Sequence, residues 1–362
     1  MSRDTVWKQT GLFQAVRAVS PTLPSAEKPL KFSIHRRFLI APFASALLAV
    51  LSMLTACHSN QPPASSNGLI QVRLQADWFP QPEHGGFYTA IVKGYYQAEG
   101  LDVTILPLGQ YTSVPPLVAS GGAEFGLGSS DQILVAVSNG LPLAAIGATM
   151  QHDPQAIMVH KDSPVHGFAS LEGKSIAAQP GAIWLKFIES KYSLKEVRET
   201  PATHSIANFL ADPNYIQQIF VTSEPYFVKK AGVEYRTMLI SSAGYDPYRV
   251  YFVRKDYMEQ HPGVVAKFVR ATIKGWKEYL RDPGPANALI LKLNPAQNPE
   301  QMQFTLQALK DGNFITGPDT SGAEIGNMTP ERWAATNQQL TALGVIRKPI
   351  DPTSAYTLKF LP

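Results

Sequence analysis

The residues best suited to chemistry gather in the stretch 77–88, where an acid, a tryptophan, a histidine and a tyrosine lie close together. The rings of Trp78 and Tyr88 could stack on a flat molecule, because an aromatic face offers a large contact area at little entropic cost. Asp77 could accept hydrogen bonds from an amine or a ring N–H, and His84 could donate one to an oxygen. Structural roles compete with these: the aromatics could pack in a core, Asp77 could brace its loop, and His84 could cap a helix.

A second group of candidates opens helices further along the chain. Glu224 precedes a proline and could either bind an amine or merely favour the first turn of a helix through the helix dipole. Free backbone N–H groups at a helix start suit a phosphate, carboxylate or sulfonate, although every helix start also needs ordinary capping. These helix starts are at Ser129, Ser130 and Gly181, and the remaining candidate ligand contacts are Trp184, Tyr226, Tyr245 and Asp246.

The spacing of the residues gives little indication of a metal site or of a catalytic nucleophile. His152 and His160 are separated by an expected strand, and the single cysteine of the chain cannot complete a metal cluster. The order of Ser, His and Asp residues matches no catalytic triad, and no glycine-rich loop has the spacing that cradles a nucleotide. We therefore expect no metal site, no cofactor and no catalytic residue, so that the chain would bind a small molecule without making or breaking a bond.

A strand–loop–helix–strand unit positions the stretch 77–88. Residues 70–75 alternate between apolar and polar, which is the period of a half-buried strand. One helix follows, with aromatic and aliphatic residues at helical spacing and Gly100 as its C-terminal cap, and residues 101–108 form the next strand. Ligands of open α/β sheets bind in loops at the carboxyl ends of strands, so this loop is expected to face a ligand.

Strands and helices continue to alternate in two groups. The apolar residues 143–148 indicate a buried strand of the parallel type, the polar residues 151–154 a crossing to a second lobe, and residues 248–253 the return crossing. Towards the end of the chain we expect helices that begin near 261 and cover 284–293, 299–310 and 330–343. The predicted fold class is α/β, with two lobes and a hinged cleft between them: lobe I comprises 69–152 and 249–362, and lobe II comprises 153–248.

The basic charge of the chain belongs to its N-terminal segment. Residues 1–57 hold seven Lys and Arg against two Asp and Glu, so the remainder carries −1 of the total net charge of +4. A near-neutral body gives no indication of nucleic acid binding. A positive cluster at 35–37 and an apolar run at 38–54 predict a signal peptide over 1–57.

The residues at the end of this signal peptide, Leu54–Cys57, resemble the lipobox of bacterial lipoproteins. That resemblance implies lipidation of Cys57, and the polar residues 58–68 would then form a flexible tether. The alternative is a transmembrane anchor, but the apolar run is short of roughly 20 residues and contains Pro42.

The stretch 77–103 closely resembles the opening of the thiamine-pyrimidine-synthase-like proteins. The matching residues are Asp77–Pro80, His84–Ala90 and Lys93–Val103, with shorter matches at Gly128–Asp131, Glu224–Tyr226 and Gly244–Tyr248. The resemblance spans about 69–275 and implies a type II periplasmic binding fold. It also implies capture of a small-molecule ligand for an ABC importer, by a monomer whose partners are a permease with its ATPase and the membrane that holds its lipid.

The function expected from this resemblance is that of a solute-binding lipoprotein that faces the periplasm or the exterior. Its ligand would be a small planar nitrogen heterocycle such as a pyrimidine precursor of thiamine. Alternatives are a sulfonate, nitrate or flavin-type ligand on the same scaffold, a sensory module that reports to a partner protein, and a pyrimidine-synthase-like enzyme. The synthase branch uses a cysteine-rich motif with iron, whereas the one cysteine here is Cys57, so the binding branch fits better.

Overall fold

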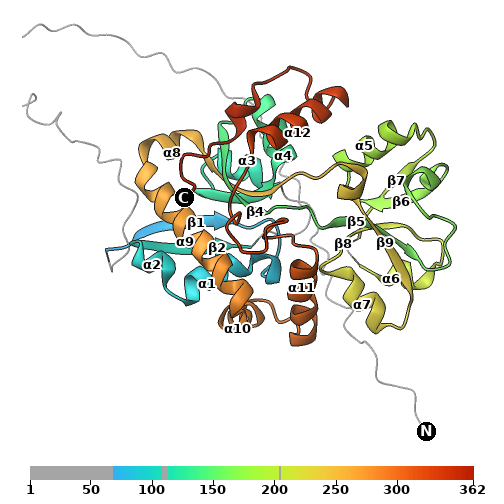
Figure 1. Ribbon diagram of the computed structural model, residues 1–362, viewed down its shortest axis with the longest axis horizontal. Helices are drawn as coiled ribbons and strands as arrows, with labels where there is room; N and C mark the ends of the chain where they lie inside the picture. Colours follow the sequence, from blue (N-terminus) through green and yellow to red (C-terminus); the bar gives the residue numbers. More distant parts are fainter. Residues whose placement is uncertain (1–67, 108–112, 204) are drawn as a thin grey trace, which may run out of the picture. The chain divides into compact units, whose positions relative to one another are not determined.

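The computed structural model describes residues 68–107, 113–203 and 205–362 (Figure 1). The expected signal peptide, Cys57 and all but the last residue of the expected tether lie outside these ranges. Within them, no helix has both the length and the apolar composition that crossing a bilayer requires.

The first sheet has five strands, β1 (Ile70–Gln75), β2 (Leu101–Leu106), β3 (Phe125–Ser129), β4 (Leu143–Met150) and β10 (Arg249–Arg254). Their order in the sheet is β2-β1-β3-β10-β4. Strand β1 pairs in parallel with β2 and β3, whereas β10 runs antiparallel to both β3 and β4. The return strand β10 therefore lies between β3 and β4, in a sheet whose other strands come from the first part of the described chain.

The prediction of a parallel strand at 143–148 is corrected, because β4 pairs with β10 in the antiparallel sense. Every residue of β4 is buried. A strand that is buried on both faces has a continuous apolar sequence whether it pairs in the parallel or the antiparallel sense. The apolar run therefore indicates burial but not the direction of the strand.

The second sheet also has five strands, β5 (Gln155–His160), β6 (Ser175–Ala178), β7 (Arg198–Pro201), β8 (Gln217–Phe220) and β9 (Tyr235–Leu239). Their order is β7-β6-β8-β5-β9, and all five fall between β4 and β10 in the sequence. Strand β6 is parallel to β7 and β8, and β5 is antiparallel to β8 and β9. The lobe boundaries given above remain a prediction.

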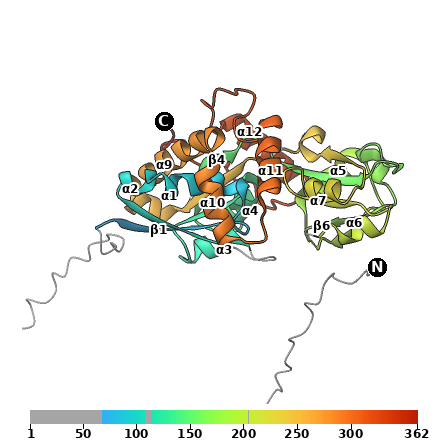
Figure 2. The same cartoon turned by 90° about the horizontal axis from the view of Figure 1, so that it is seen from below.

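The helices lie around the two sheets (Figures 1 and 2). The α-helices are α1 (Gly85–Val92), α2 (Tyr95–Ala98), α3 (Val114–Ala119), α4 (Ser130–Ser138), α5 (Ile183–Tyr192), α6 (Ala207–Ala211), α7 (Glu224–Lys230), α8 (Lys255–Gln260), α9 (Pro262–Arg281), α10 (Gly284–Leu293), α11 (Pro299–Asp311) and α12 (Pro330–Ala342). Short 3-10 turns are η1 (Pro82–His84), η2 (Phe168–Leu171), η3 (Ile240–Ala243) and η4 (Pro352–Ala355).

The single helix expected before Gly100 is divided into α1 and α2. The break falls at Gly94, whose φ of 69° lies in the left-handed region that glycine adopts without strain. The N–H of Gly94 bonds to the carbonyl of Ile91 in α1, and Gly94 is the N-cap of α2. The apolar periodicity continues across this break, so it could not reveal that there are two helices.

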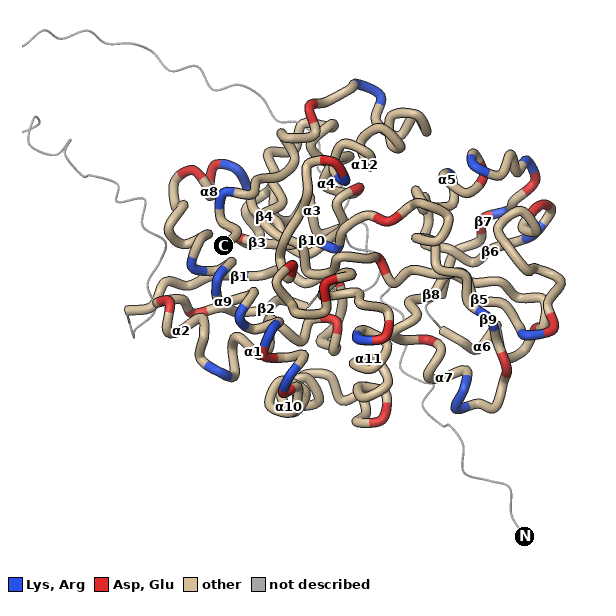
Figure 3. Tube along the Cα trace, in the orientation of Figure 1, with Lys and Arg blue, Asp and Glu red and all other residues tan. Residues whose placement is uncertain are grey.

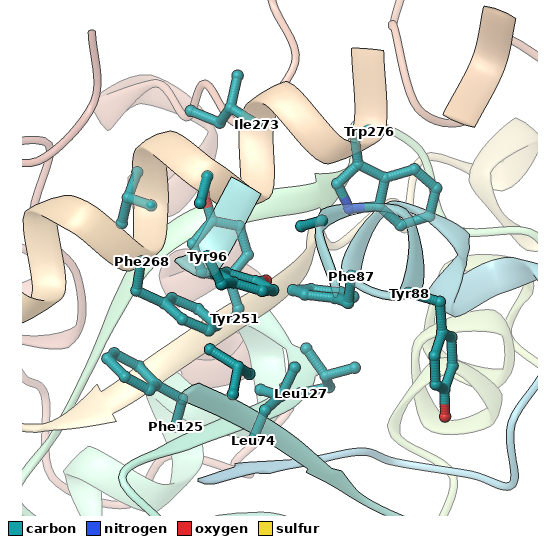
Figure 4. Packing of buried hydrophobic residues seen from close by; sticks show 14 of the residues in the cluster. Leu74, Phe87, Tyr88, Tyr96, Phe125, Leu127, Tyr251, Phe268, Ile273 and Trp276 are labelled. Atoms are coloured by element: carbon teal, nitrogen blue, oxygen red, sulfur yellow. The ribbon is translucent and has the colours of Figure 1, made fainter. Parts of the chain in front are cut away.

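Successive side chains of β10 point to opposite faces of the first sheet and therefore join two different hydrophobic clusters. Tyr251 and Val253 join the cluster that contains Phe87 and Phe268, whereas Phe252 joins the cluster on the other face. Figure 4 shows the first cluster, in which aromatic rings from α1, β3, β10 and α9 pack together. The rings of Phe125 and Phe268 stack with centroids 4.0 Å apart.

Close approach of α1 to α9 fixes the start of α1, and with it the loop that precedes it. A Cβ added at Gly86 would lie 2.2 Å from the indole of Trp276 on α9. Glycine is therefore needed at this position for space, not for its backbone conformation.

Candidate functional site

A pocket of about 530 Å³ lies between elements of the two sheets. The first sheet and its connections contribute Asp77, Trp78, Gln81, Glu83, Gln132 and Arg249 to the lining. The second sheet and α7 contribute Gln155, Gln179, Gln218, Phe220 and Glu224. A volume of this size is in the usual range for small-molecule sites, roughly 300–1,000 Å³.

The loop after β1 brings Asp77 and Trp78 to this pocket. Trp78 is half-buried and meets Phe79 edge-on, with ring centroids 5.7 Å apart. The side-chain amide of Asn294 donates a 2.9 Å hydrogen bond to the carbonyl of Pro80, which ties the loop to the end of α10. The loop therefore has a fixed path from the sheet to η1 and α1.

Asp77 is the centre of an ion-pair network. His84 Nε2 lies 2.9 Å from Asp77 Oδ1, and the guanidinium of Arg249 donates a short hydrogen bond to Asp77 Oδ2. Burial alone would raise the pKa of Asp77, but the charge of Arg249 and the hydrogen bond with His84 outweigh it and hold the pKa below its usual range. Asp77 is therefore a carboxylate at neutral pH.

Arg249 is shared between two carboxyl groups. Its Nη1 lies 3.9 Å from Asp153 Oδ2, and its guanidinium carbon lies 5.6 Å from the ring centroid of Phe220. Burial would lower the pKa of Arg249, but Asp77 and Asp153 raise it above its usual value. Burial raises the pKa of Asp153 to about 6 despite the neighbouring guanidinium. The positive charge of Arg249 is thus compensated inside the protein.

Glu83 links the two sheets at the pocket. It is 6% exposed, and Thr222 Oγ1 donates a 2.7 Å hydrogen bond to its Oε1. The hydroxyl of Thr305 on α11 donates a 2.7 Å hydrogen bond to the carbonyl of Thr222. Burial raises the pKa of Glu83.

Glu224, which is half-buried, is the second glutamate of the lining whose charged form is disfavoured by burial. The backbone N–H of Phe220 donates a 2.9 Å hydrogen bond to Glu224 Oε2, but burial raises the pKa of Glu224 to about 7. Near neutral pH this group can therefore offer either a proton donor or an acceptor to a ligand.

A pH-dependent stability difference is expected for Glu224→Gln. Because the folded pKa of about 7 exceeds the ordinary 4.5, the stability linked to this group is present below pH 4.5 and is lost as pH rises through 7. An amide mimics the neutral acid. The variant should therefore be more stable than the parent chain at pH 8, by an amount on the order of 1–3 kcal/mol, and equally stable at pH 4.

Urea unfolding at both pH values measures this difference. Glu234→Gln, at an exposed acid directly before β9, provides the control and should show no such rise with pH. A difference between Glu224→Gln and the parent that is the same at pH 4 and pH 8 would contradict the account.

The helix starts proposed as anion sites are bonded within the protein. The N–H of Ser129 donates to Gln132 Oε1 at 3.2 Å, the N–H of Ser130 to the carbonyl of Tyr248 at 2.9 Å, and the N–H of Gly181 to Glu199 Oε1 at 2.8 Å. Ser129 and Ser130 are also buried. The Ser129 bond is part of a capping box, and the other two N–H groups are used by Tyr248 and Glu199.

Five further predicted site residues are not part of the pocket lining and contact other residues instead. Tyr88 and Trp184 are buried in the hydrophobic clusters of the first and second sheet. The hydroxyl oxygen of Tyr226 lies within hydrogen-bond distance of Asn298 Oδ1, at 3.1 Å, and of Glu300 Oε2, at 3.0 Å. Tyr245 donates to Asp131 at 2.6 Å, and Asp246 pairs with His152 at 2.7 Å and with Arg332 at 3.0 Å.

The structure thus brings Asp77, Trp78 and Glu224 to one pocket, with His84 behind Asp77. Sequence reasoning missed Glu83, Arg249 and the glutamines of the lining. A signal existed for Arg249, because a charged residue directly before the buried run 250–253 needs a partner or a function. The glutamines gave none, since single polar residues at strand ends are common on ordinary surfaces.

The arrangement favours a neutral or cationic planar ligand with N–H groups. Among the described lining residues, carboxyl groups outnumber the one guanidinium, and that guanidinium is already paired. Trp78 and Phe220 supply aromatic surface. Figure 3 shows Lys and Arg interspersed with Asp and Glu along the described chain. The described residues contain no group of three or more His, Cys, Asp and Glu placed to hold a metal ion.

Comparison with protein-family models matches residues 81–286 to a family described as NMT1/THI5 like. The riboflavin-binding protein RibY of Chloroflexus aurantiacus is 25% identical over 344 residues, which covers 87% of this chain and 96% of the relative. The formylaminopyrimidine-binding protein of Halalkalibacterium halodurans is 23% identical over 331 residues, covering 86% and 97%. Other relatives bear the name of a pyrimidine phosphate synthase.

Solved structures support the fold. The periplasmic aliphatic sulphonate binding protein SsuA from Escherichia coli superposes with a TM-score of 0.59 at 15% identity, covering 78% of this chain and 91% of that one. At this identity the likeness shows the fold alone. The expected α/β periplasmic binding fold is thereby confirmed.

Proposed function

Because the chain belongs to the NMT1/THI5-like family, we propose that it is an extracytoplasmic solute-binding protein that captures a planar nitrogen heterocycle for an ABC importer. The ligand binds in the pocket between the two sheets and is passed unchanged to a permease with its ATPase. A pyrimidine precursor of thiamine and a flavin-type ring both belong to this ligand class.

The observation that carries the proposal is the charge balance of the pocket. Glu83 and Glu224 offer carboxyl groups to a ligand, burial raises the pKa of Glu83 and brings that of Glu224 to about 7, and Trp78 lines the pocket with its ring. A ring N–H or an exocyclic amine can donate to such carboxyls, and the flat ring can stack on the indole. A sulfonate or nitrate would meet acids and a guanidinium that is already paired with Asp77.

The same chemistry supports binding over catalysis. The pocket lining contains no cysteine, and the one cysteine of the chain is Cys57, which we propose carries the lipid anchor. A lipidated Cys57 and a short polar tether would hold the binding unit at the outer face of a membrane, close to its permease, as a monomer.

Replacing Trp78 with alanine should weaken binding of a planar heterocycle. Stacking of a base-like ring on an aromatic side chain contributes about 1–3 kcal/mol, which corresponds to a loss of roughly 5- to 150-fold in affinity. Calorimetric titration of the full chain in detergent, with riboflavin and with a pyrimidine precursor of thiamine as probes, measures the change.

Phe79→Ala is the matched control, because Phe79 is the next residue, is 43% exposed and does not line the pocket. Its affinity should fall less than about threefold, which is under 1 kcal/mol. The ligand proposal is overturned if the parent chain shows no heat with either heterocycle and binds an alkanesulfonate instead.

A further inference from the structure

Two side-chain amides and a buried acid form a continuous hydrogen-bonded chain on one wall of the pocket. Gln218 Nε2 donates to Gln155 Oε1 at 2.8 Å, and Gln155 Nε2 donates to Asp153 Oδ2 at 3.2 Å. At the other end, the backbone N–H of Gln179 donates to Gln218 Oε1 at 2.9 Å. We call this chain, from Gln179 N–H through Gln218 and Gln155 to Asp153, the amide relay.

The strand register brings the two amides together. Gln218 on β8 lies opposite Ile157 on β5, so Gln155 is its diagonal neighbour on the same face of the sheet. Both glutamines are half-buried and line the pocket, whereas Asp153 is 3% exposed behind them.

The two ends of the amide relay fix the orientation of both amides. A backbone N–H can only donate, so Gln218 must turn its oxygen towards Gln179. An ionised carboxylate can only accept, so Gln155 must turn its nitrogen towards Asp153, which is also held by the backbone N–H of Gln155 at 2.9 Å. A flip of either amide would place two donors or two acceptors against each other.

Each NH₂ group has two hydrogens, and the amide relay uses one of each. Among the described residues, the second hydrogen of Gln155 Nε2 and of Gln218 Nε2 has no acceptor. A polar group that is partly withdrawn from water without a partner is unfavourable, so these two hydrogens are available to a ligand acceptor.

Resting on the proposed function, we infer that Gln155 and Gln218 are specificity-determining donors that select a heterocycle carrying a carbonyl group. The carbonyl oxygen accepts from the amide relay while the N–H groups of the ring or its substituents donate to Glu83 and Glu224. A heterocycle without a carbonyl offers the amide hydrogens only ring nitrogens or a hydroxyl, which are weaker acceptors than a carbonyl oxygen. Asp153 is a positioning residue, since it acts on the ligand only through Gln155.

Three probes and two matched variants test the inference. The probes are riboflavin and an N-formylated aminopyrimidine, which carry carbonyl groups, and 4-amino-5-hydroxymethyl-2-methylpyrimidine, which carries none. The parent chain should bind the carbonyl-bearing probes at least about tenfold more tightly than the third, as expected for one well-formed hydrogen bond.

Gln218→Met removes the donor without adding charge. This variant should lower the affinity for the two carbonyl-bearing probes at least about tenfold, and the affinity for the carbonyl-free probe less than about threefold. Gln179→Met changes the same residue type on the same wall, but its side chain takes no part in the amide relay, so it should cost much less. Circular dichroism and urea midpoints verify that both variants are folded.

Asp153→Asn tests the positioning role of Asp153 through the ratio of affinities for the probes, which a purely structural role of Asp153 would leave unchanged. Asparagine can donate as well as accept, so it no longer forces the direction of Gln155. The ratio of affinities for carbonyl-bearing and carbonyl-free probes should therefore fall at least about fivefold, as expected when one oriented hydrogen bond is lost.

The outcomes separate the inference from the proposed function. If the parent chain binds the heterocycles but Gln218→Met weakens all three probes equally, or none, the role of the amide relay is overturned and the function stands. If the parent chain binds no heterocycle and binds a sulfonate, the proposed function itself fails.

Discussion

Replacing Arg249 with methionine is expected to lower the free energy of unfolding by about 3–5 kcal/mol, because it leaves buried carboxyl groups without their counter-charge. Asp77 loses the partner that keeps its pKa low, and Asp153, which is 3% exposed, loses the guanidinium that lies 3.9 Å from its carboxylate. The contact of Arg249 with Phe220 of the second sheet is lost as well.

The effect should depend on pH in a defined direction. Without Arg249 the folded pKa of Asp77 should rise above its unfolded value, so the added cost is present at pH 8 and shrinks towards pH 4, where both carboxyls take up protons. Urea unfolding at the two pH values measures this. Arg249→Lys keeps the positive charge but not the planar guanidinium with its several donors. Its free energy of unfolding should therefore fall less than that of the methionine variant.

A double replacement, Arg249→Met with Asp77→Asn, should recover part of the loss, because the amide needs no counter-charge. A loss of less than about 1 kcal/mol in the free energy of unfolding of Arg249→Met, which is typical of an exposed ion pair, would show that the network is not a buried one.

Replacing Gly275 with alanine is expected to destabilise the chain by about 3 kcal/mol or more, because helices α1 and α9 would have to separate. An added Cβ would lie 2.2 Å from the carbonyl oxygen of Gly86 and 2.9 Å from Ala90 Cβ. The nearer neighbour is backbone, which cannot move aside as a flexible side chain can. Because α1 follows the loop of Asp77 and Trp78, ligand affinity should fall as well.

Gly263→Ala is the matched control on the same helix. A Cβ at Gly263 meets no atom within 4 Å, and the residue does not have a positive φ. Alanine there should leave stability unchanged or raise it slightly, by up to about 1 kcal/mol, through helix propensity. Equal unfolding midpoints for the two variants in urea would contradict the close packing of α1 on α9.

Local patterns predicted the elements that position the site. The alternation over 70–75 and the proline and glycine breaks after it placed Asp77 and Trp78 in a loop at the carboxyl end of a strand, where the pocket lies. The helix at Glu224 was likewise predicted from its neighbouring residues, and α7 begins at that residue. These features depend on neighbours in sequence, so the sequence carries them.

Contacts between distant residues could not be read in the same way. Arg249 and Asp77 are 172 positions apart, and Gln218 and Gln155 are 63 apart. Nothing local distinguishes a glutamine that completes the amide relay from one on a surface. Trp184 and Tyr245 illustrate the reverse case, since an aromatic residue at a helix start or in a glycine-containing loop can equally turn into the core, where both side chains lie.

The most direct test of the account is a competition between ligand classes. The full chain, purified in detergent at pH 7.5, is dialysed against equal concentrations of a carbonyl-bearing heterocycle such as riboflavin and an alkanesulfonate, and the bound fraction is identified by mass spectrometry. We expect the heterocycle to be retained at one molecule per chain and the sulfonate to be lost. Retention of the sulfonate with exclusion of the heterocycle would contradict this expectation.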